Sequence, residues 1–477
     1  MSVETPPAGI ATEDWQATPL AVRALVLTLL QQVEQLQARL VVMEERLNQN
    51  SRNSSKPPSA DPPQTSGRPA RAASGRPAGG QPGHAGHNRR LKPPSEVEQW
   101  VEVRPTSCAH CGTLLLGYDG QPERHQVTEL PRIAPQITEY RRHTLECLHC
   151  GRSTPAAWPS DMPAGDFGPR LQATSAYLSG RMGLSHRDIV ETCQTLLHLE
   201  LSLGSIHTQA VAVSLAVAEA VNAAQDYVQH QPIVNVDETG WFERAQHAWL
   251  WLAATPLVSF FLVLHTRSAK GLLVLLGEQS SAIVGSDRFS AYNGLDPGQR
   301  QVCWAHLRRD FQKLVERGGP SKAIGVGLLA QAEQWFTLWQ RVRAGTLSRP
   351  DFQTAVRPIR AQVQCLLQAG VQLPHGQTRS LCLNLLKLEG ALWTFVAVEG
   401  IEPTNNLAER GLRRAVLWRR RSFGTQSEAG SQFVARILTV VTTLRQQHRD
   451  VLDYLTDACQ AAIRGQKPPS LLPPQST

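Results

Sequence analysis

Three acidic residues, far apart in the sequence, have the surroundings of metal ligands. Asp237 ends the apolar run 233–236, Asp287 ends the run 282–286, and Glu409 lies where the segment EPTNNLAERGLRR is expected to start a helix. Mg²⁺ prefers oxygen ligands, and two such ions about 3.5–4 Å apart can hold both the attacking and the leaving oxygen of a phosphodiester displacement. The sequence therefore predicts a site for two Mg²⁺ or Mn²⁺ ions that breaks and joins phosphodiesters.

Each of these assignments has an alternative. Glu238 could serve in place of Asp237, and Glu402 is the second candidate for the third acid. If Asn406 is an N-cap, Glu409 falls at the third helical position, where a capping-box acid bonds back to the cap. The residues alone leave Glu409 open between a structural and a catalytic role.

The elements around the first two acids predict how these acids meet. Strand patterns cover 233–236, 247–254 and 258–264, a helical pattern covers 268–278, and a fourth strand covers 282–286. In an RNase H-like order of this kind the first and fourth strands are neighbours, which brings Asp237 and Asp287 to one edge. Thr255-Pro256 divides the apolar stretch 248–264, so we expect a β-hairpin there and no membrane span.

Two C-x-x-C pairs predict a structural zinc site within a small domain over 96–160. The pairs are Cys108 with Cys111 and Cys147 with Cys150. Four thiolates form the closed tetrahedron that structural Zn²⁺ prefers, and His110 or His149 could replace one of them. The chain has nine cysteines and no secretory signal, which argues against a disulfide framework.

The N-terminal segment 20–50 carries a heptad repeat. Its two core positions hold Val22, Leu29, Leu36 and Met43, and Val26, Val33, Leu40 and Leu47. About four heptads favour a coiled coil, and hence a homodimer or a higher oligomer. The alternative is an amphipathic helix that packs on its own domain.

Composition and hydrophobic periodicity predict the structure of three further segments. Residues 51–95 are basic and rich in Pro, Gly and Ser, which predicts a disordered linker with charge for phosphate. Residues 166–228 have a helical pattern and could hold a helix-turn-helix reader of DNA, although plain helix packing gives the same pattern. Residues 446–477 are expected to form a helix and a disordered tail.

Arginines cluster after Glu409. Their guanidinium groups suit phosphate, and the cluster predicts DNA as a partner more strongly than the net charge of +8 does. A solvated basic face is the alternative. The candidate DNA-binding residues are Arg410, Arg413, Arg414, Arg419 and Arg420, together with Arg308 and Arg309 upstream.

Several motifs together resemble the insertion sequence 66 family of DDE transposases. They are VNVDETGW, GSDRFSAY, CWAHLRRDF and NNLAERGLRR, with NSSKPPS and GGQPGHAGH upstream. The resemblance covers nearly the whole chain. It implies that Asp237, Asp287 and Glu409 form the metal-binding triad of an RNase H-like catalytic domain over 229–445, with a mostly helical insertion over about 310–400.

The resemblance also implies further site residues. In CWAHLRR the residues His306, Arg308 and Arg309 would follow a fifth strand and lie near the acids, where His306 could position DNA or be a structural histidine. Three tryptophans of the insertion are expected in its core: Trp335, Trp339 and Trp393.

The expected protein is a multidomain α+β DNA transposase. It would bind the terminal inverted repeats of an insertion sequence, cleave a strand and transfer it into target DNA, in the bacterial cytoplasm and associated with the nucleoid. Small accessory proteins of the same element are further implied partners. The alternatives are a zinc-containing DNA-binding regulator with an inactive RNase H-like domain, and a nuclease without strand transfer.

Overall fold

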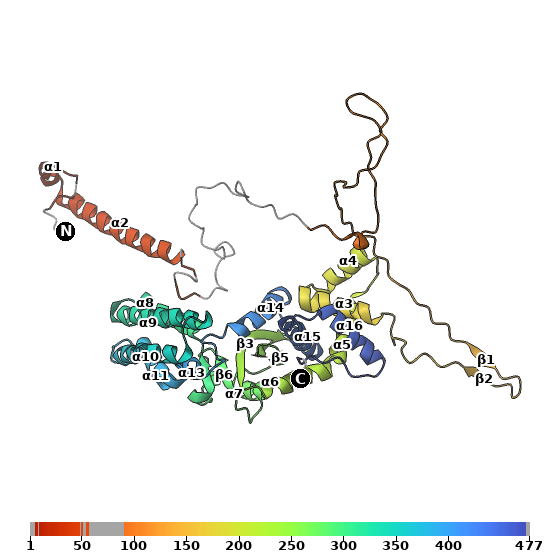
Figure 1. Ribbon diagram of the computed structural model, residues 1–477. Coiled ribbons are helices and arrows are strands. Elements are labelled where there is room, and N and C mark those ends of the chain that lie inside the picture. Colours follow the sequence, from red (N-terminus) through yellow and green to blue (C-terminus); the bar gives the residue numbers. More distant parts are fainter. Residues whose placement is uncertain (1–4, 8, 48, 51–53, 57–89, 474–477) are drawn as a thin grey trace.

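The computed structural model describes residues 5–7, 9–47, 49–50, 54–56 and 90–473 (Figure 1). Most of the linker expected over 51–95 lies outside these residues. The described chain is a mixed α/β structure with a globular body, a separate N-terminal helix and two thin arms.

Among the described residues, five strands form the sheet of the body, in the order β5-β4-β3-β6-β7. The long strands β3 (Ile233–Glu243), β4 (Gln246–Ala254) and β5 (Ser259–Leu264) are antiparallel neighbours. The short strands β6 (Ile283–Ser286) and β7 (Arg300–Val302) run parallel to β3. This confirms the predicted hairpin and the predicted adjacency of the first and fourth strands.

The sequence predicts that Asp237 ends its strand, but in the structure the strand continues past Asp237. Strand β3 continues to Glu243 because β4 pairs with it from Asn235 to that end, whereas the pairing of β3 with β6 stops at Asn235. The first acid therefore lies within a long strand at the point where one neighbouring strand ends.

Helices cover the sheet and bury its apolar side chains in one core. The helix α7 (Ala269–Leu276) links β5 to β6. Helix α15 (Glu428–Gln446) covers the free edge of β5, where Thr443 Oγ1 accepts the Ser259 N–H at 3.1 Å and Thr439 Oγ1 accepts the Phe261 N–H at 3.0 Å. These bonds satisfy backbone donors that an open edge would expose.

The segment 166–228 is helical, as predicted. Its elements are α3 (Pro169–Tyr177), the π-helical turn η4 (Leu178–Met182), α4 (His186–Leu197), α5 (Leu203–Ala216) and α6 (Ala218–Gln229). Helix α5 packs against α15, and both α3 and α5 pack against α16 (Val451–Ile463), so this region shares a core with the sheet.

The helical insertion forms a second core beside the sheet (Figure 1). It starts earlier than the expected residue 310, because Trp304 already packs within it. Trp335, Trp339 and Trp393 are buried there as predicted. The elements are α8 (Trp304–Glu316), α9 (Gly319–Arg343), α10 (Arg349–Val371), α11 (Gly376–Lys387), α12 (Glu389–Leu392) and α13 (Thr394–Ala397).

The heptad segment forms the helix α2 (Leu20–Leu47), preceded by α1 (Thr12–Ala17). Its core-position residues do not pack on the body: Leu29 is 50% exposed, Leu36 56% and Leu40 58%. Packing on its own domain is therefore not what the structure shows, and the coiled coil stays a prediction.

The end of the chain departs from the expected disordered tail. Leu471 is fully buried, and the Tyr454 hydroxyl donates to the Pro469 carbonyl at 2.7 Å. Leu471 and the neighbouring Leu472 pack into the core of the body, which holds this segment in place. Across the described residues, no helix is both long enough and apolar enough to cross a membrane.

Candidate active site and metal ligands

Asp237 and Asp287 are brought together by strand register. Strands β3 and β6 pair Val234 with Val284 and Asn235 with Gly285, so two residues further along the same register places Asp237 opposite Asp287. Neighbouring strands lie about 4.8 Å apart. The two acids therefore meet where the parallel pairing ends.

Gly285 leaves space beside the paired strands for the side chain of Asn235. A Cβ at Gly285 would lie 2.6 Å from Asn235 Nδ2, so only glycine leaves room for that amide. Asn235 Nδ2 donates to Asn405 Oδ1 at 2.9 Å, and Asn405 Nδ2 donates to the Val236 carbonyl at 2.8 Å. These bonds tie the start of the glutamate helix to the strand of the first aspartate.

The acids repel one another electrostatically. Burial raises the pKa of Asp237 well above its usual range, and the charges of Glu238, Asp287 and, least, Glu409 raise it further. Such a cluster favours a bound cation, because a divalent ion replaces the repulsion with attraction. The carboxylate chemistry fits Mg²⁺ or Mn²⁺, but among the described residues the ligand atoms of Asp237, Asp287 and Glu409 do not all lie within 4.8 Å of one another.

Arg300 fixes the backbone around Asp287. Its fully buried guanidinium donates to the Asp287 carbonyl at 2.8 Å and to the Tyr292 carbonyl at 3.1 Å, and burial lowers its pKa to about 10. The Asp287 side chain accepts the Phe289 N–H at 2.8 Å. Sequence reasoning missed Arg300, since nothing local in the sequence shows that its side chain is buried.

Glu238 has structural partners. Its carboxylate accepts hydrogen bonds from Arg267 Nε at 2.9 Å and from the buried Tyr292 hydroxyl. The side chain is 1% exposed, and burial raises its pKa. This arrangement occupies both carboxylate oxygens and argues against Glu238 as the alternative to Asp237.

Glu409 is not the acid of a capping box. The helix α14 (Asn406–Ser422) has Asn405 as its N-cap, so Glu409 is the fourth helical residue rather than the third. The Asn405 side chain makes no cap bond because it bonds to β3 instead. Gly411 lets α14 approach the sheet, since a Cβ there would lie 2.6 Å from Leu252 Cδ2. The competing Glu402 is exposed.

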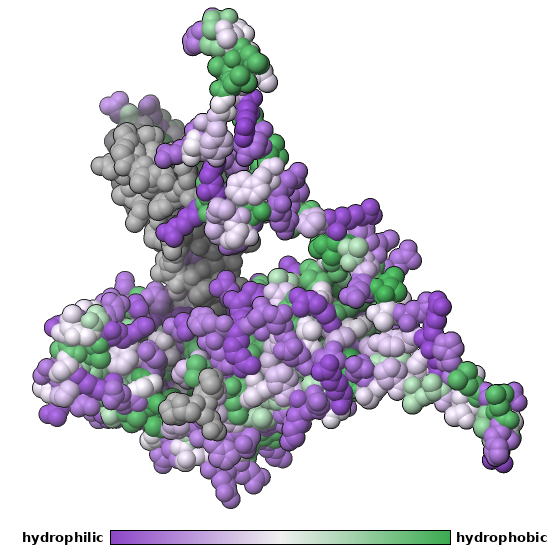
Figure 2. Space-filling view, turned by 45° about the vertical axis from the view of Figure 1, so that its right-hand side comes forward, coloured by the Kyte–Doolittle hydropathy of each residue, from purple (hydrophilic) through white to green (hydrophobic). Residues whose placement is uncertain are grey.

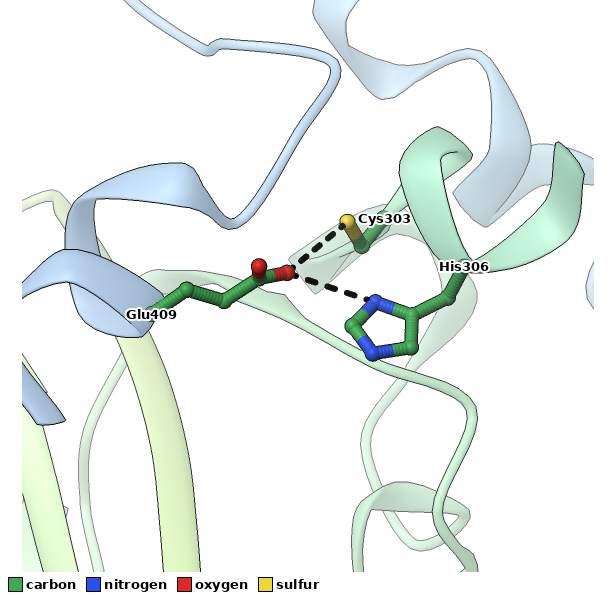
Figure 3. Close-up of side chains that lie close together, drawn as sticks. All are labelled: Cys303, His306 and Glu409. Atoms are coloured by element: carbon green, nitrogen blue, oxygen red, sulfur yellow. Dashed lines mark hydrogen bonds and ion pairs between the residues drawn. The ribbon is translucent and has the colours of Figure 1, made fainter. Parts of the chain in front are cut away.

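The Glu409 carboxylate faces the first turn of α8 (Figure 3). Its Oε1 lies 3.5 Å from His306 Nδ1 and 3.9 Å from Cys303 Sγ. Burial and the charge of Arg309 lower the pKa of His306, while burial raises the pKa of Cys303 to about 11. The three side chains offer ligand atoms within 4.8 Å of one another.

The candidate DNA-binding arginines divide into two groups. Arg410, Arg413 and Arg420 are exposed, and the first two line a recess of ≈ 470 Å³ together with Arg414 and Arg445. Other members hold the fold. Arg419 donates to Thr239 Oγ1 at 2.9 Å and to the Gly240 carbonyl at 2.6 Å, and Arg414 donates to the Arg181 carbonyl.

The two arginines of CWAHLRR lie on α8. Arg308 is exposed, lies 3.3 Å from Glu333 and stacks over Phe336. Arg309 is half-buried, and its positive charge helps to lower the pKa of His306. The structure therefore places His306 beside Glu409, as the resemblance implied, whereas Arg308 contacts α9.

Each C-x-x-C pair forms a tight turn of its own. The Gly112 N–H donates to the Cys108 carbonyl at 2.9 Å, and the Gly151 N–H donates to the Cys147 carbonyl at 2.8 Å. Hydrogen bonds lower the pKa of Cys111, chiefly from Thr113, and of Cys147, chiefly from Cys150. Each turn therefore holds two cysteines, one of which has a lowered pKa, and such a pair fits half of a zinc site.

The two halves lie in separate arms (Figure 1). The second pair is on an arm with the strands β1 (Thr144–Glu146) and β2 (Ser153–Pro155), and the first follows the turn η3 (Pro94–Glu96). In the part of the chain that is described, the only set of three metal-binding side chains is the one around Glu409. The structure does not bring the four cysteines together.

The arms also expose apolar side chains, visible as green atoms in Figure 2 against a largely hydrophilic body. Leu116 is 89% exposed and Ile137 88%. Surface of this kind is what a folded metal domain would bury.

Family comparisons assign most of the chain. The model of the family described as "Transposase IS66 family" matches residues 164–433, and the "zinc-finger binding domain of transposase IS66" matches residues 105–151. A family of unknown function matches residues 6–90.

Two proteins of Sinorhizobium fredii are similar to the chain. The uncharacterized protein y4qI is 28% identical over 199 residues, which cover 39% of this chain and 36% of that protein. The uncharacterized protein y4hP is 24% identical over 407 residues, which cover 76% of this chain and 71% of that protein.

Proposed function

The chain belongs to the IS66 family of transposases, and we propose that it binds the terminal inverted repeats of an insertion sequence, cleaves a strand there and transfers it into target DNA. The observation that carries the proposal is the register that sets Asp237 opposite Asp287. The strand order, with three antiparallel strands followed by two parallel ones, supports an RNase H-like catalytic core.

Asp237, Asp287 and Glu409 are the residues that would hold two Mg²⁺ or Mn²⁺ ions. Ions at such a site supply charge stabilisation for the attacking and leaving oxygens. The protein's own part is positioning: Arg300 fixes the Asp287 backbone, and Asn405 holds the start of α14 against β3. Fixed geometry of this kind is a large share of phosphoryl-transfer catalysis.

Arg410 and Arg413 would bind DNA phosphates along the exposed face of α14, one turn from Glu409. Because Arg414 and Arg419 are engaged by backbone carbonyls, they would support this face rather than contact DNA first. His306 would position Glu409 or a DNA phosphate.

Because residues 105–151 match a zinc-finger domain, this region is proposed to bind one Zn²⁺ ion. The proposed ligands are its four paired cysteines: Cys108, Cys111, Cys147 and Cys150. Binding to all four would draw the two arms into one unit. This unit, the basic linker and the helices α4 and α5 are the proposed readers of the terminal repeats.

The exposed heptad face of α2 supports a homodimer or a higher oligomer through a coiled coil. Accessory proteins of the same element and a place on the bacterial nucleoid follow from the proposed activity.

The experiment is a cleavage assay on a duplex that contains the element end, with and without Mg²⁺. Asp237→Ala and Asp287→Ala should each abolish nicking and leave DNA binding intact. Asp457→Ala, at an exposed aspartate of α16, is the matched control. Full cleavage by either active-site variant would refute the proposal.

The same assay separates the alternatives. A regulator with an inactive catalytic domain would bind the ends and produce no Mg²⁺-dependent nicks in the unmodified chain. A nuclease without strand transfer would produce nicks but no joined products when target DNA is present.

A further inference from the structure

A second set of metal donors lies beside the acidic pair, and it differs from that pair in chemistry. We propose that Cys303, His306 and Glu409 form a binding site for a thiophilic divalent cation such as Zn²⁺. Glu409 would then be shared between this site and the Mg²⁺ site, and only one of the two could use its carboxylate at a time.

The spacing of the donors suits a tetrahedral ion. Zinc bonds of about 2.0 Å to oxygen or nitrogen and 2.3 Å to sulfur set ligand atoms roughly 3.3–3.8 Å apart. In the structure Glu409 Oε1 lies 3.5 Å from His306 Nδ1 and 3.9 Å from Cys303 Sγ, and all three ligand atoms lie within 4.8 Å of one another (Figure 3). Small side-chain rotations would close the remaining difference.

Burial disfavours the free thiolate of Cys303, but two local features would support that thiolate once a metal is bound. Cys303 Sγ accepts the Asn405 N–H at 3.2 Å, and Cys303 is the N-cap residue of α8, at the positive end of that helix. Both features stabilise the negative charge that a thiol acquires when it binds a metal.

His306 is also placed to bind a metal ion. His306 Nδ1 points toward Glu409, is buried and makes no hydrogen bond to the residues that are described. A buried ring nitrogen without a hydrogen-bond partner is costly, and a metal ion would satisfy it. The His306 N–H donates to the Cys303 carbonyl at 3.1 Å, which holds both ligands in one turn.

The donor types select against the hard cation. Mg²⁺ takes oxygen ligands and keeps several waters, so a site with one sulfur and one nitrogen favours Zn²⁺ or Co²⁺. Binding of such an ion would hold Glu409 toward α8 and away from Asp237. The resulting inhibition of cleavage rests on the proposed function, whereas the binding itself does not.

The binding test uses Co²⁺, because its thiolate complexes absorb visible and near-ultraviolet light. To remove metal binding by the arms, serine replaces the four arm cysteines in the full-length chain: Cys108, Cys111, Cys147 and Cys150. We expect one equivalent of Co²⁺ per chain with a thiolate charge-transfer band, displaced by one equivalent of Zn²⁺. Adding Cys303→Ser should abolish the band, and adding Cys365→Ser, at an exposed cysteine of α10, should leave it unchanged.

Asp237→Asn with Asp287→Asn should also retain the band, since neither aspartate belongs to the proposed set. Absence of a thiolate band, or its persistence in Cys303→Ser, would overturn the inference. If the chain without arm cysteines fails to fold, the zinc content of the unmodified chain is compared with that of Cys303→Ser by native mass spectrometry. One zinc fewer supports the site, and an equal content refutes it.

A cleavage arm tests the consequence. At fixed Mg²⁺, the Zn²⁺ concentration that halves nicking should rise at least about tenfold in Cys303→Ser, as expected for loss of a ligand-sphere interaction. Binding without inhibition would keep the metal site and contradict the role of Glu409 in cleavage. Inhibition that is equal in both proteins would place the inhibitory zinc elsewhere.

Discussion

Asp237 lies opposite Asp287, two residues beyond Asn235 and Gly285, the last paired positions of β3 and β6. The two acids come from strands that are separated by a hairpin and a helix, and the sheet makes them neighbours. Glu409 reaches the same region from α14, whose start is bonded to β3 through Asn405.

The third acid can be identified by paired substitutions. Glu409→Gln should slow Mg²⁺-dependent cleavage at least about hundredfold, because a metal ligand contributes several kcal/mol of charge stabilisation. Glu402→Gln, at an exposed position, should change the rate no more than about twofold. Loss of cleavage only in Glu402→Gln would reverse the assignment.

The stability of the metal-free protein should depend on the charge of Asp237. Its pKa is raised in the folded state, so the folded state holds the proton more tightly than the unfolded state does. Stability should therefore fall as pH rises above about 4, the pKa of an unperturbed aspartate. Asp237→Asn should melt at a higher temperature than the unmodified chain at pH 7, with no difference below pH 4.

Thermal melts with and without Mg²⁺ check this prediction. Added Mg²⁺ should reduce the difference in melting temperature between Asp237→Asn and the unmodified chain. It should do so by stabilising the unmodified chain, because an ion that binds the folded state raises its melting temperature. Asp457→Asn serves as the control and should show no such pH dependence. A destabilised Asp237→Asn protein at pH 7 without metal would contradict the electrostatic account.

Tyr292 should contribute to stability through Glu238. Its hydroxyl donates to the buried carboxylate, and Tyr292→Phe removes that donor. Loss of a hydrogen bond to a charged group costs about 1.5–3 kcal/mol, measurable by urea unfolding. Tyr118→Phe, at a tyrosine that is 78% exposed, should change the free energy of unfolding by less than about 0.5 kcal/mol. Equal effects would mean that the Glu238 bond is not stabilising.

The arginines of α14 should separate into binding and structural residues. Arg410→Ala and Arg413→Ala should each lower the slope of log K against log salt by about 1, with melting temperature unchanged. Arg419→Ala should lower the melting temperature, since it loses its bonds to Thr239 and Gly240. The reverse pattern would show that the face of α14 does not bind DNA.

Zinc should fold the arms without affecting the body. Cys147→Ser, or a chelator, should remove the arm zinc and make residues 97–165 sensitive to limited proteolysis, because metal binding supplies the folding free energy of so small a unit. The body should keep its melting temperature, and Cys365→Ser should stay protected. Equal sensitivity of zinc-bound and zinc-free arms would refute a site built from both pairs.

Local patterns were enough to predict the sheet and the helical lobe. The apolar runs that became β3 and β6 end in acids, and their strand order follows from short connections, so the adjacency of Asp237 and Asp287 could be inferred. The tryptophans of the insertion follow helical spacing, and their burial was predictable for the same reason. The resemblance added the insertion itself and the choice of Glu409.

Other features had no local signal. The role of Asn405 as N-cap, and its use of the side chain for β3 rather than for the helix, depend on a strand about 170 residues away. The same holds for Arg300, and for the order in the tail around Leu471. Ligand roles for the three acids and the coiled coil stay predictions.

By itself, the sequence determined which segments form strands and helices, the family, and the residue types that could bind metal, because periodicity and motif spacing are local properties of the chain. The tertiary structure decided which of those residues share a site. Packing of α14 against the sheet brings Glu409 beside Cys303 and His306 at the start of α8. The same fold engages Glu238 and Arg419 in structural bonds and leaves the two cysteine pairs in separate arms. Contacts between distant segments depend on the whole fold, and no local pattern encodes them.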